Sequence, residues 1–155
     1  AICLAFLLYR KNIMKVLHSL ADYEPKILLA FGESLKGDRK FTDFLMTNQF
    51  QELAALSGAI NSDTDALNWL LQSDFPEFGV LSNAIDGEDN ALEWLKKYNC
   101  DFLLKFALAC QKNDQAIKWF VDNDLRIFIL LIRTIHDILL HQSWDSSDIH
   151  KIRRS

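Results

Sequence analysis

Turn-forming and cross-linking residues are scarce in this chain of 155 residues, which has two prolines, five glycines and three cysteines. Because β-rich folds need many Gly/Pro turns, long helices joined by short turns are favoured here. Cys3, Cys100 and Cys110 are too few and too far apart for a disulfide framework, so a reducing compartment is indicated. We therefore expect a helical, cytoplasmic protein.

Motifs of enzymes and metal proteins are also missing. The His and Cys residues form no Cys-x-x-Cys or His-Glu-x-x-His spacing, and there is no glycine-rich phosphate loop. The segment Asp86–Asn90 begins like a Ca²⁺ loop, with oxygen ligands at alternate positions. The match then fails, because Ala91 stands where the loop needs glycine and Lys97 where it needs glutamate. The sequence predicts no enzyme activity, no cofactor and no metal.

No apolar run reaches the length of a membrane span, which is about 20 residues. Residues 1–8 are apolar and are followed by Arg10 and Lys11, which is also how the end of a truncated span with cytoplasmic basic residues looks. Residues 125–140 are interrupted by charged and polar side chains. We favour a terminal repeat helix for residues 1–8, and we expect no membrane span within this chain.

Charge is unevenly distributed around a formal net value of −4. Residues 50–99 carry nine acidic and two basic side chains, whereas the segments on either side are nearly neutral. Nucleic-acid binding needs a basic surface, so no nucleic acid is expected as a partner. The three basic residues of the tail, Lys151, Arg153 and Arg154, are too few to change this.

What the sequence has in abundance is self-similarity. The four tryptophans stand at positions 69, 94, 119 and 144, each 25 residues after the last. Three of them share one local pattern of small, aliphatic, polar, Trp and large apolar residues: Ala66–Leu70, Ala91–Leu95 and Ala116–Phe120. Phe41–Leu45 repeats the pattern with Phe in place of Trp.

A second pattern precedes each of these segments, with apolar residues at i, i+3, i+6 and i+7, except that Ser34 takes the i+6 position in the first of the four full copies. It starts at Leu28, Leu53, Phe78 and Leu103 and describes one face of a short α-helix. Each unit is therefore predicted to be a helix A, a polar turn and a helix B. The full copies are 25–49, 50–74, 75–99 and 100–124, with degenerate end copies at 1–24 and 125–149. In the last copy the polar turn is replaced by apolar residues, which predicts one longer capping helix.

This organisation resembles the α-solenoid class, which includes the HEAT, armadillo and tetratricopeptide arrays. The resemblance is architectural and covers nearly the whole chain, although those repeats are longer, at about 34–47 residues. It implies an all-α fold, a short right-handed solenoid of helix–turn–helix repeats with a 25-residue period, in a single domain of residues 1–155. No functional residues can be carried over from it.

Two features of helix B can be predicted from the register. The aromatic residues Phe44, Trp69, Trp94 and Trp119 are expected to be buried between units, the alternative being an exposed ladder that grips a peptide or a sugar chain. Side chains just ahead of helix B are expected to cap it. These are Asp63 or Thr64, Asp89, and Asn113 or Asp114.

The turns between helices A and B predict a candidate binding surface. A 25-residue step returns the chain to the same place one layer along, so successive turns should form one acidic edge. Its residues are Asp63, Asp65, Asp86, Glu88 and Asp89. The function favoured is a non-enzymatic scaffold that binds another protein, with a basic surface, along the array. The alternatives are a HEAT-like nucleic-acid-binding domain and a regulatory domain of a larger membrane-anchored protein.

Overall fold

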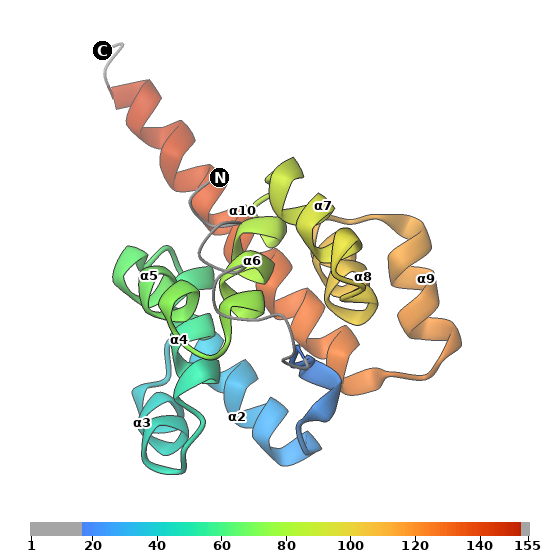
Figure 1. Cartoon of the computed structure of the whole chain (residues 1–155). Coiled ribbons are helices and arrows are strands. Elements are labelled where there is room, and N and C mark those ends of the chain that lie inside the picture. Colours follow the sequence, from blue (N-terminus) through green and yellow to red (C-terminus); the bar gives the residue numbers. More distant parts are fainter. Residues whose placement is uncertain (1–16, 153–155) are drawn as a thin grey trace.

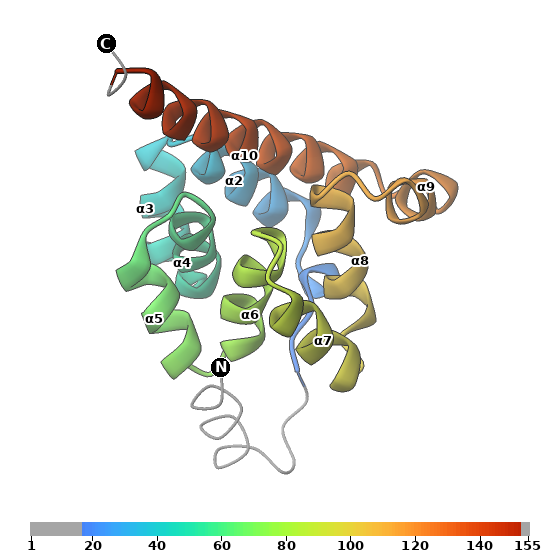
Figure 2. The same ribbon diagram turned by 90° about the horizontal axis from the view of Figure 1, so that it is seen from above.

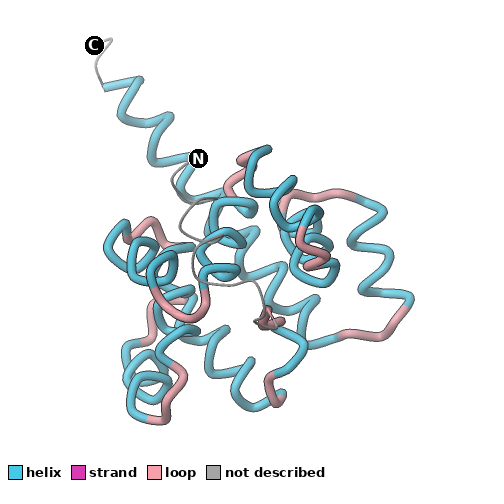
Figure 3. The backbone as a smooth tube through the Cα atoms, in the orientation of Figure 1, coloured by secondary structure: helices cyan, strands magenta, loops and turns pink. Residues whose placement is uncertain are grey.

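The described part of the protein is helical throughout. A computed structural model describes residues 17–152, with the side chains of residues 17–145, and every regular element in that range is a helix (Figure 3). Turns of three residues join the successive helices from α2 onward. The elements in chain order are η1 (Leu20–Asp22), α2 (Pro25–Leu35), α3 (Arg39–Thr47), α4 (Gln51–Ile60), α5 (Thr64–Gln72), α6 (Pro76–Ile85), α7 (Asp89–Lys97), α8 (Asp101–Cys110), α9 (Asp114–Asp122) and α10 (Arg126–Ile152).

The helices form an inner and an outer layer. The inner helices α2, α4, α6 and α8 pack side by side in chain order, and each outer helix, α3, α5, α7 or α9, packs on the two helices that flank it in sequence (Figures 1 and 2). The outer helices begin at Arg39, Thr64, Asp89 and Asp114, each 25 residues after the last. This packing against neighbours is compatible with a helical repeat.

Burial follows the apolar patterns of the two kinds of helix. The inner helices each bury five or more residues, including Phe31, Leu56, Leu81 and Phe106 at equivalent places. The outer helices each bury a single narrow stripe. Its central members are Leu45, Leu70, Leu95 and Phe120, all fully buried. Since burying one such side chain contributes about 1.5–3 kcal/mol, these columns account for much of the driving force for packing.

The prediction that the aromatic column is buried is wrong for Phe44 and Trp69 and is confirmed only in part for Trp94 and Trp119, which pack against the core. Phe44 and Trp69 are 40% and 46% exposed, and Trp94 and Trp119 are half-buried. Successive helix residues lie about 100° apart around the axis, so the residue before the buried stripe lies on its flank. Trp94 packs on Tyr98, the residue that follows α7, with ring centroids 4.5 Å apart.

The capping prediction is confirmed at two of its three places. The Asp63 carboxylate accepts hydrogen bonds from the backbone N–H groups of Asp65 and Ala66, and the Asn113 side chain accepts one from Ala116. Asp89 is not a cap. It is the first residue of α7, and Glu88 occupies the capping position without a side-chain hydrogen bond.

The two end copies depart from the repeat in different ways. The last copy forms the predicted long helix, α10, with 27 residues. The described part of the first copy, residues 17–24, contains only the three-residue helix η1, so a helix B through Leu17 and Leu20 is not formed there. Residues 1–16 of that copy lie outside the described residues, as do the basic residues 153 and 154 of the tail.

Helix α10 crosses the carboxyl ends of the inner helices, as Figure 2 shows. It packs on α2, α8 and α9, so it links the first inner helix to the last. The Gln142 side-chain amide donates to the backbone oxygen of Ile60 at 3.1 Å and to the Ser62 hydroxyl at 3.0 Å. Leu131 lies so close to Gly32 that a Cβ there would sit 3.1 Å from its methyl carbon.

The other end of the inner layer is covered by residues 17–23. This segment reaches α8 through η1, α6 through His18 and α4 through Tyr23. Its apolar residue Leu20 is fully buried. Residues 17–23 therefore cover parts of α4, α6 and α8.

The contrast between the buried stripe and its flank gives a stability test within one helix. Leu70→Ala should lower the free energy of unfolding by about 2–5 kcal/mol, because it leaves a cavity in the core. Trp69→Ala, one residue earlier and half exposed, should cost about 1 kcal/mol. Urea unfolding followed by far-UV circular dichroism measures both, and a larger loss for Trp69→Ala would contradict this register.

Candidate functional site

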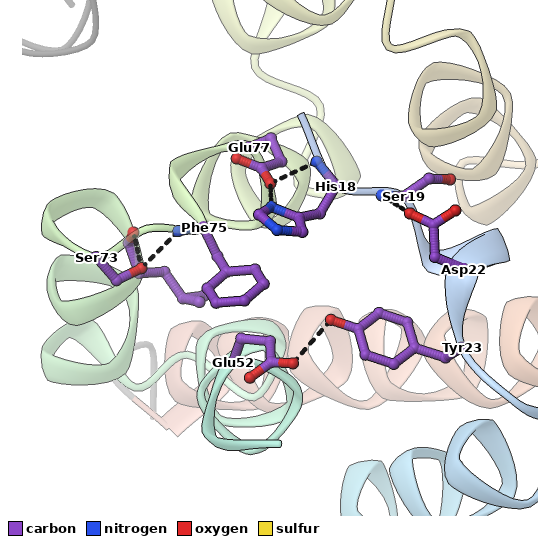
Figure 4. Close-up of polar contacts among 9 residues, drawn as sticks. His18, Ser19, Asp22, Tyr23, Glu52, Ser73, Phe75 and Glu77 are labelled. Carbon is purple, nitrogen blue, oxygen red and sulfur yellow. Dashed lines mark hydrogen bonds and ion pairs between the residues drawn. The ribbon is translucent and has the colours of Figure 1, made fainter. Parts of the chain in front are cut away.

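A cluster of polar side chains lies at the amino ends of the inner helices. Two glutamates, Glu52 and Glu77, are the second residues of α4 and α6, and both are buried. Residues 17–23 run past them and supply the hydrogen-bond donors that they receive (Figure 4). Buried carboxylates are costly unless they are paired, so this contact is the most specific polar feature of the described structure.

Glu77 is bound by His18 through a single carboxylate oxygen. Its Oε1 accepts from the His18 backbone N–H at 2.9 Å and lies 2.7 Å from the His18 Nδ1 (Figure 4). The Glu77 side chain is 1% exposed, whereas that of His18 is 37% exposed. The second oxygen, Oε2, is buried and has no hydrogen-bond partner among the described residues. The carboxylate therefore has the capacity for a further donor.

Glu52 is bound by the hydroxyl group of Tyr23. The phenolic O–H donates to Glu52 Oε1 at 2.8 Å. The pKa of the Tyr23 phenol is raised, first by burial and then by the hydrogen bond to Glu52. The phenol is therefore held in its neutral, donating form across the physiological range.

Aromatic rings and helix ends complete the surroundings of the two carboxylates. The His18 ring lies 4.3 Å from the Phe75 ring, and the Tyr23 ring packs edge-on against Phe50 at 6.1 Å. Phe50 and Phe75 precede α4 and α6 and give no side-chain cap. The amino end of a helix carries partial positive charge, which favours an ionised carboxylate in its first turn. The site thus combines apolar walls with two anchored acceptors.

Nucleophilic chemistry is not favoured at this site. Cys100 immediately precedes α8, and burial followed by the charge of Glu77 raises its pKa to about 11. Burial also raises the pKa of Cys110. In the described part of the chain no three His, Cys, Asp or Glu side chains are placed to hold a metal ion. What the arrangement can do is accept hydrogen bonds from a segment with suitably spaced donors.

The acidic edge predicted from the sequence lies at the opposite ends of the inner helices. All five residues are exposed, and the turns that carry them follow the neighbouring helices α4 and α6. Asp63 serves as a cap. Partial burial and the nearby charge of Glu88 raise the pKa of Asp86, as expected where like charges crowd together.

Part of the acidic surplus in residues 50–99 is internal. Of the nine acidic residues in that segment, Glu52 and Glu77 are buried and receive donors from residues 17–23. The surface charge is correspondingly smaller than the sequence suggests. These two glutamates were not predicted as site residues, although a signal was available, because the equivalent positions in other copies are Ile27 and Phe102.

A hollow of about 490 Å³ lies between α8, α9 and α10. Its floor is apolar, with Ile117, Phe120 and Ile132. Its charged lining is balanced, because Lys112 and Arg133 are accompanied by Asp114 and Asp137. The hollow therefore shows no preference for a ligand of one charge, and the glutamate cluster remains the better defined site.

The Tyr23–Glu52 contact can be tested by a double-mutant cycle. Tyr23→Phe should lower the free energy of unfolding by about 1–3 kcal/mol, because it removes the hydroxyl donor from a buried carboxylate. Adding Glu52→Leu should recover most of this loss, since both partners are then apolar. Tyr98→Phe, at an exposed tyrosine, serves as the control. Urea unfolding that shows additive losses for the pair would contradict the contact.

Thiol labelling tests the protection of the two described cysteines. In a Cys3→Ser background at pH 8, Cys100 and Cys110 should react slowly with a thiol reagent until urea unfolds the chain. A pKa raised from 9.0 to about 11 lowers the thiolate fraction of Cys100 about a hundredfold. The Cys100 thiol ionises at a lower pH in the unfolded chain than in the folded chain. The contribution of Cys100 to the free energy of unfolding should therefore fall as the pH rises from 9 through 11. Rapid labelling of both thiols in the native chain would contradict this.

The comparisons with known proteins find no match for this chain among protein-family models, curated proteins or solved structures. Among the described helices, none is both long enough and apolar enough to cross a membrane. The candidate site is therefore defined by its geometry alone, as two buried carboxylates at the amino ends of α4 and α6 that accept donors from an extended segment.

Proposed function

We propose that this chain is a non-enzymatic scaffold that binds another protein. In this proposal it is a right-handed α-solenoid with a 25-residue repeat and a single domain, and its partner presents a basic surface. The observation that carries the proposal is the exposed acidic edge, Asp63, Asp65, Asp86, Glu88 and Asp89.

The edge holds more carboxylates than the helices need. Among the five residues, Asp63 alone makes a side-chain cap. Asp65 and Asp89 lie in the first turns of α5 and α7, where negative charge complements the helix dipole. Asp86 and Glu88 raise the local charge further, and the pKa of Asp86 is raised first by partial burial and then by the charge of Glu88. Such a field can steer a basic partner toward the surface.

Neutralising the edge should slow association and leave the fold intact. The variant carries Asp63→Asn, Asp65→Asn, Asp86→Asn and Glu88→Gln, and asparagine at position 63 preserves the cap. A partner captured from a lysate on the immobilised wild-type chain is then purified, and its association rate is measured by biolayer interferometry over a range of salt concentrations. We expect a rate at least 10-fold lower at low salt and a flatter dependence on salt, because steering is screened by ions.

The control variant removes the same number of carboxylates outside the edge, at Glu24, Asp43, Glu93 and Asp122, all exposed. It matches the change in net charge and should associate at a rate closer to that of the wild type. Equal slowing by both variants would mean that net charge alone matters. An unchanged rate for the edge variant would show that the edge is not the binding surface.

A further inference from the structure

The inner surface of the helical array already holds an extended segment. Residues 17–19 have no regular structure, and η1 adds one short turn before the chain reaches α2. The segment contacts three successive inner helices, α4, α6 and α8. Helical arrays commonly bind extended ligands along their surfaces. We call residues 17–23 the strap and the surface beneath them the groove.

The strap is anchored at three spaced points. His18 binds Glu77 through its backbone N–H and its ring, Leu20 is fully buried, and the Tyr23 hydroxyl binds Glu52. The pattern is a donor, an apolar side chain two residues later and a second donor three residues after that. The groove matches it with two acceptors, Glu77 and Glu52, on neighbouring helices (Figure 4).

A hydrophobic core could be filled at the positions of Glu52 and Glu77 without any hydrogen-bond acceptor. At the equivalent places α2 and α8 have Ile27 and Phe102, which pack without hydrogen-bond donors. Buried carboxylates add little net stability but discriminate strongly between a segment that brings donors and one that does not. Glu52 and Glu77 therefore give the groove selectivity for the segment that lies in it.

The strap leaves one acceptor of the groove unused. In the part of the chain that the structure describes, Glu77 Oε2 is buried and has no hydrogen-bond partner, because both contacts from His18 go to Oε1. A guanidinium group binds a carboxylate through two parallel N–H donors, one to each oxygen. An arginine in place of His18 would therefore meet both oxygens of Glu77.

We propose that the strap is an internal stand-in for a peptide segment of a partner protein. The partner segment carries arginine, an apolar residue two positions later and tyrosine three positions after that, and it displaces the strap from the groove. This inference rests on the proposed function as a protein-binding scaffold, and it names a second surface and the kind of segment that the surface accepts.

The test uses two fluorescent peptides and the full chain. One peptide has the sequence of residues 15–25, and the other has it with His18→Arg. In the strap variant, His18→Ala, Leu20→Ala and Tyr23→Phe weaken the internal competitor. Fluorescence anisotropy should show that the strap variant binds the arginine peptide at least 10-fold more tightly than the wild type does. A tethered strap competes at an effective concentration in the millimolar range, so wild-type binding should be weak.

The arginine peptide should also bind the strap variant several-fold more tightly than the histidine peptide. Adding Glu77→Gln should abolish this preference, because the amide offers only one acceptor. A peptide with the same composition in scrambled order is the control. If a strap variant that retains its helical circular dichroism binds neither peptide, or if Glu77→Gln leaves the preference intact, the proposal is wrong.

Hydrogen exchange on the wild-type chain tests the proposal without a variant that could unfold. Displacement requires that the amides of residues 18–23 open with less free energy than global unfolding. Added arginine peptide should speed the exchange of these amides. If the amides of residues 18–23 exchange only when the whole chain unfolds, with or without the peptide, the proposal is wrong. Analytical ultracentrifugation measures the oligomeric state of the strap variant. A dimer that the arginine peptide does not dissociate would mean that a second copy of this chain occupies the groove, and it would overturn the proposal.

The outcomes separate the groove from the acidic edge. The edge variant keeps Glu52, Glu77 and the strap, so its peptide binding should match that of the wild type. Loss of peptide binding with unchanged association of the captured partner would remove the groove proposal alone. Slow association of the edge variant would stand whatever the peptides do.

Discussion

A helix of nine to eleven residues is too short to be stable by itself in water, and every helix from α2 to α9 has that length. Each of them persists because it buries apolar side chains on its neighbours. Stability is therefore a property of contacts between successive helices, and the first and last helices each lack a neighbour on one side. The long helix α10 packs on α2 as well as on α8 and α9, so it supplies contacts to both ends of the inner layer.

The same constraint explains why buried charge is concentrated where the strap lies. The ends of helices leave backbone N–H groups without intrahelical partners, and the amino end favours negative charge. Glu52 and Glu77 occupy that environment on α4 and α6, and each receives a donor from the strap. Apolar residues at these positions would have covered the ends more simply. With glutamates at these positions, the packing of the strap depends on the donors of His18 and Tyr23. Covering the amino ends of α4 and α6 therefore requires a segment that carries such donors.

Much of the fold could be predicted from the sequence, because its determinants are local. The helices, the caps at Asp63 and Asn113 and the single long helix at the end follow from patterns within about 25 residues. The burial of Leu70 rather than Trp69 could not be predicted. Both are large apolar residues on adjacent sides of the same outer helix, and the sequence does not show which side packs on the inner helices. The strap was missed for a different reason. His18 and Glu77 are 59 residues apart, and only the curvature of the whole array brings them together.

Of the two candidate surfaces, the acidic edge could be predicted from the sequence and the groove could not. The distance between them decides whether the charges of one can influence the other. The acidic edge follows from the 25-residue spacing and lies after the carboxyl ends of α4 and α6, whereas the groove lies at their amino ends. A helix of ten residues is about 15 Å long. At physiological ionic strength the Debye length is about 8 Å, so charges on the edge are largely screened from the solvent-exposed part of the groove. In the two proposals, the electric field of the edge therefore acts on the approach of a partner, whereas donors and acceptors at contact distance select the segment that binds in the groove. A single partner that used both surfaces would have to extend along the full length of an inner helix.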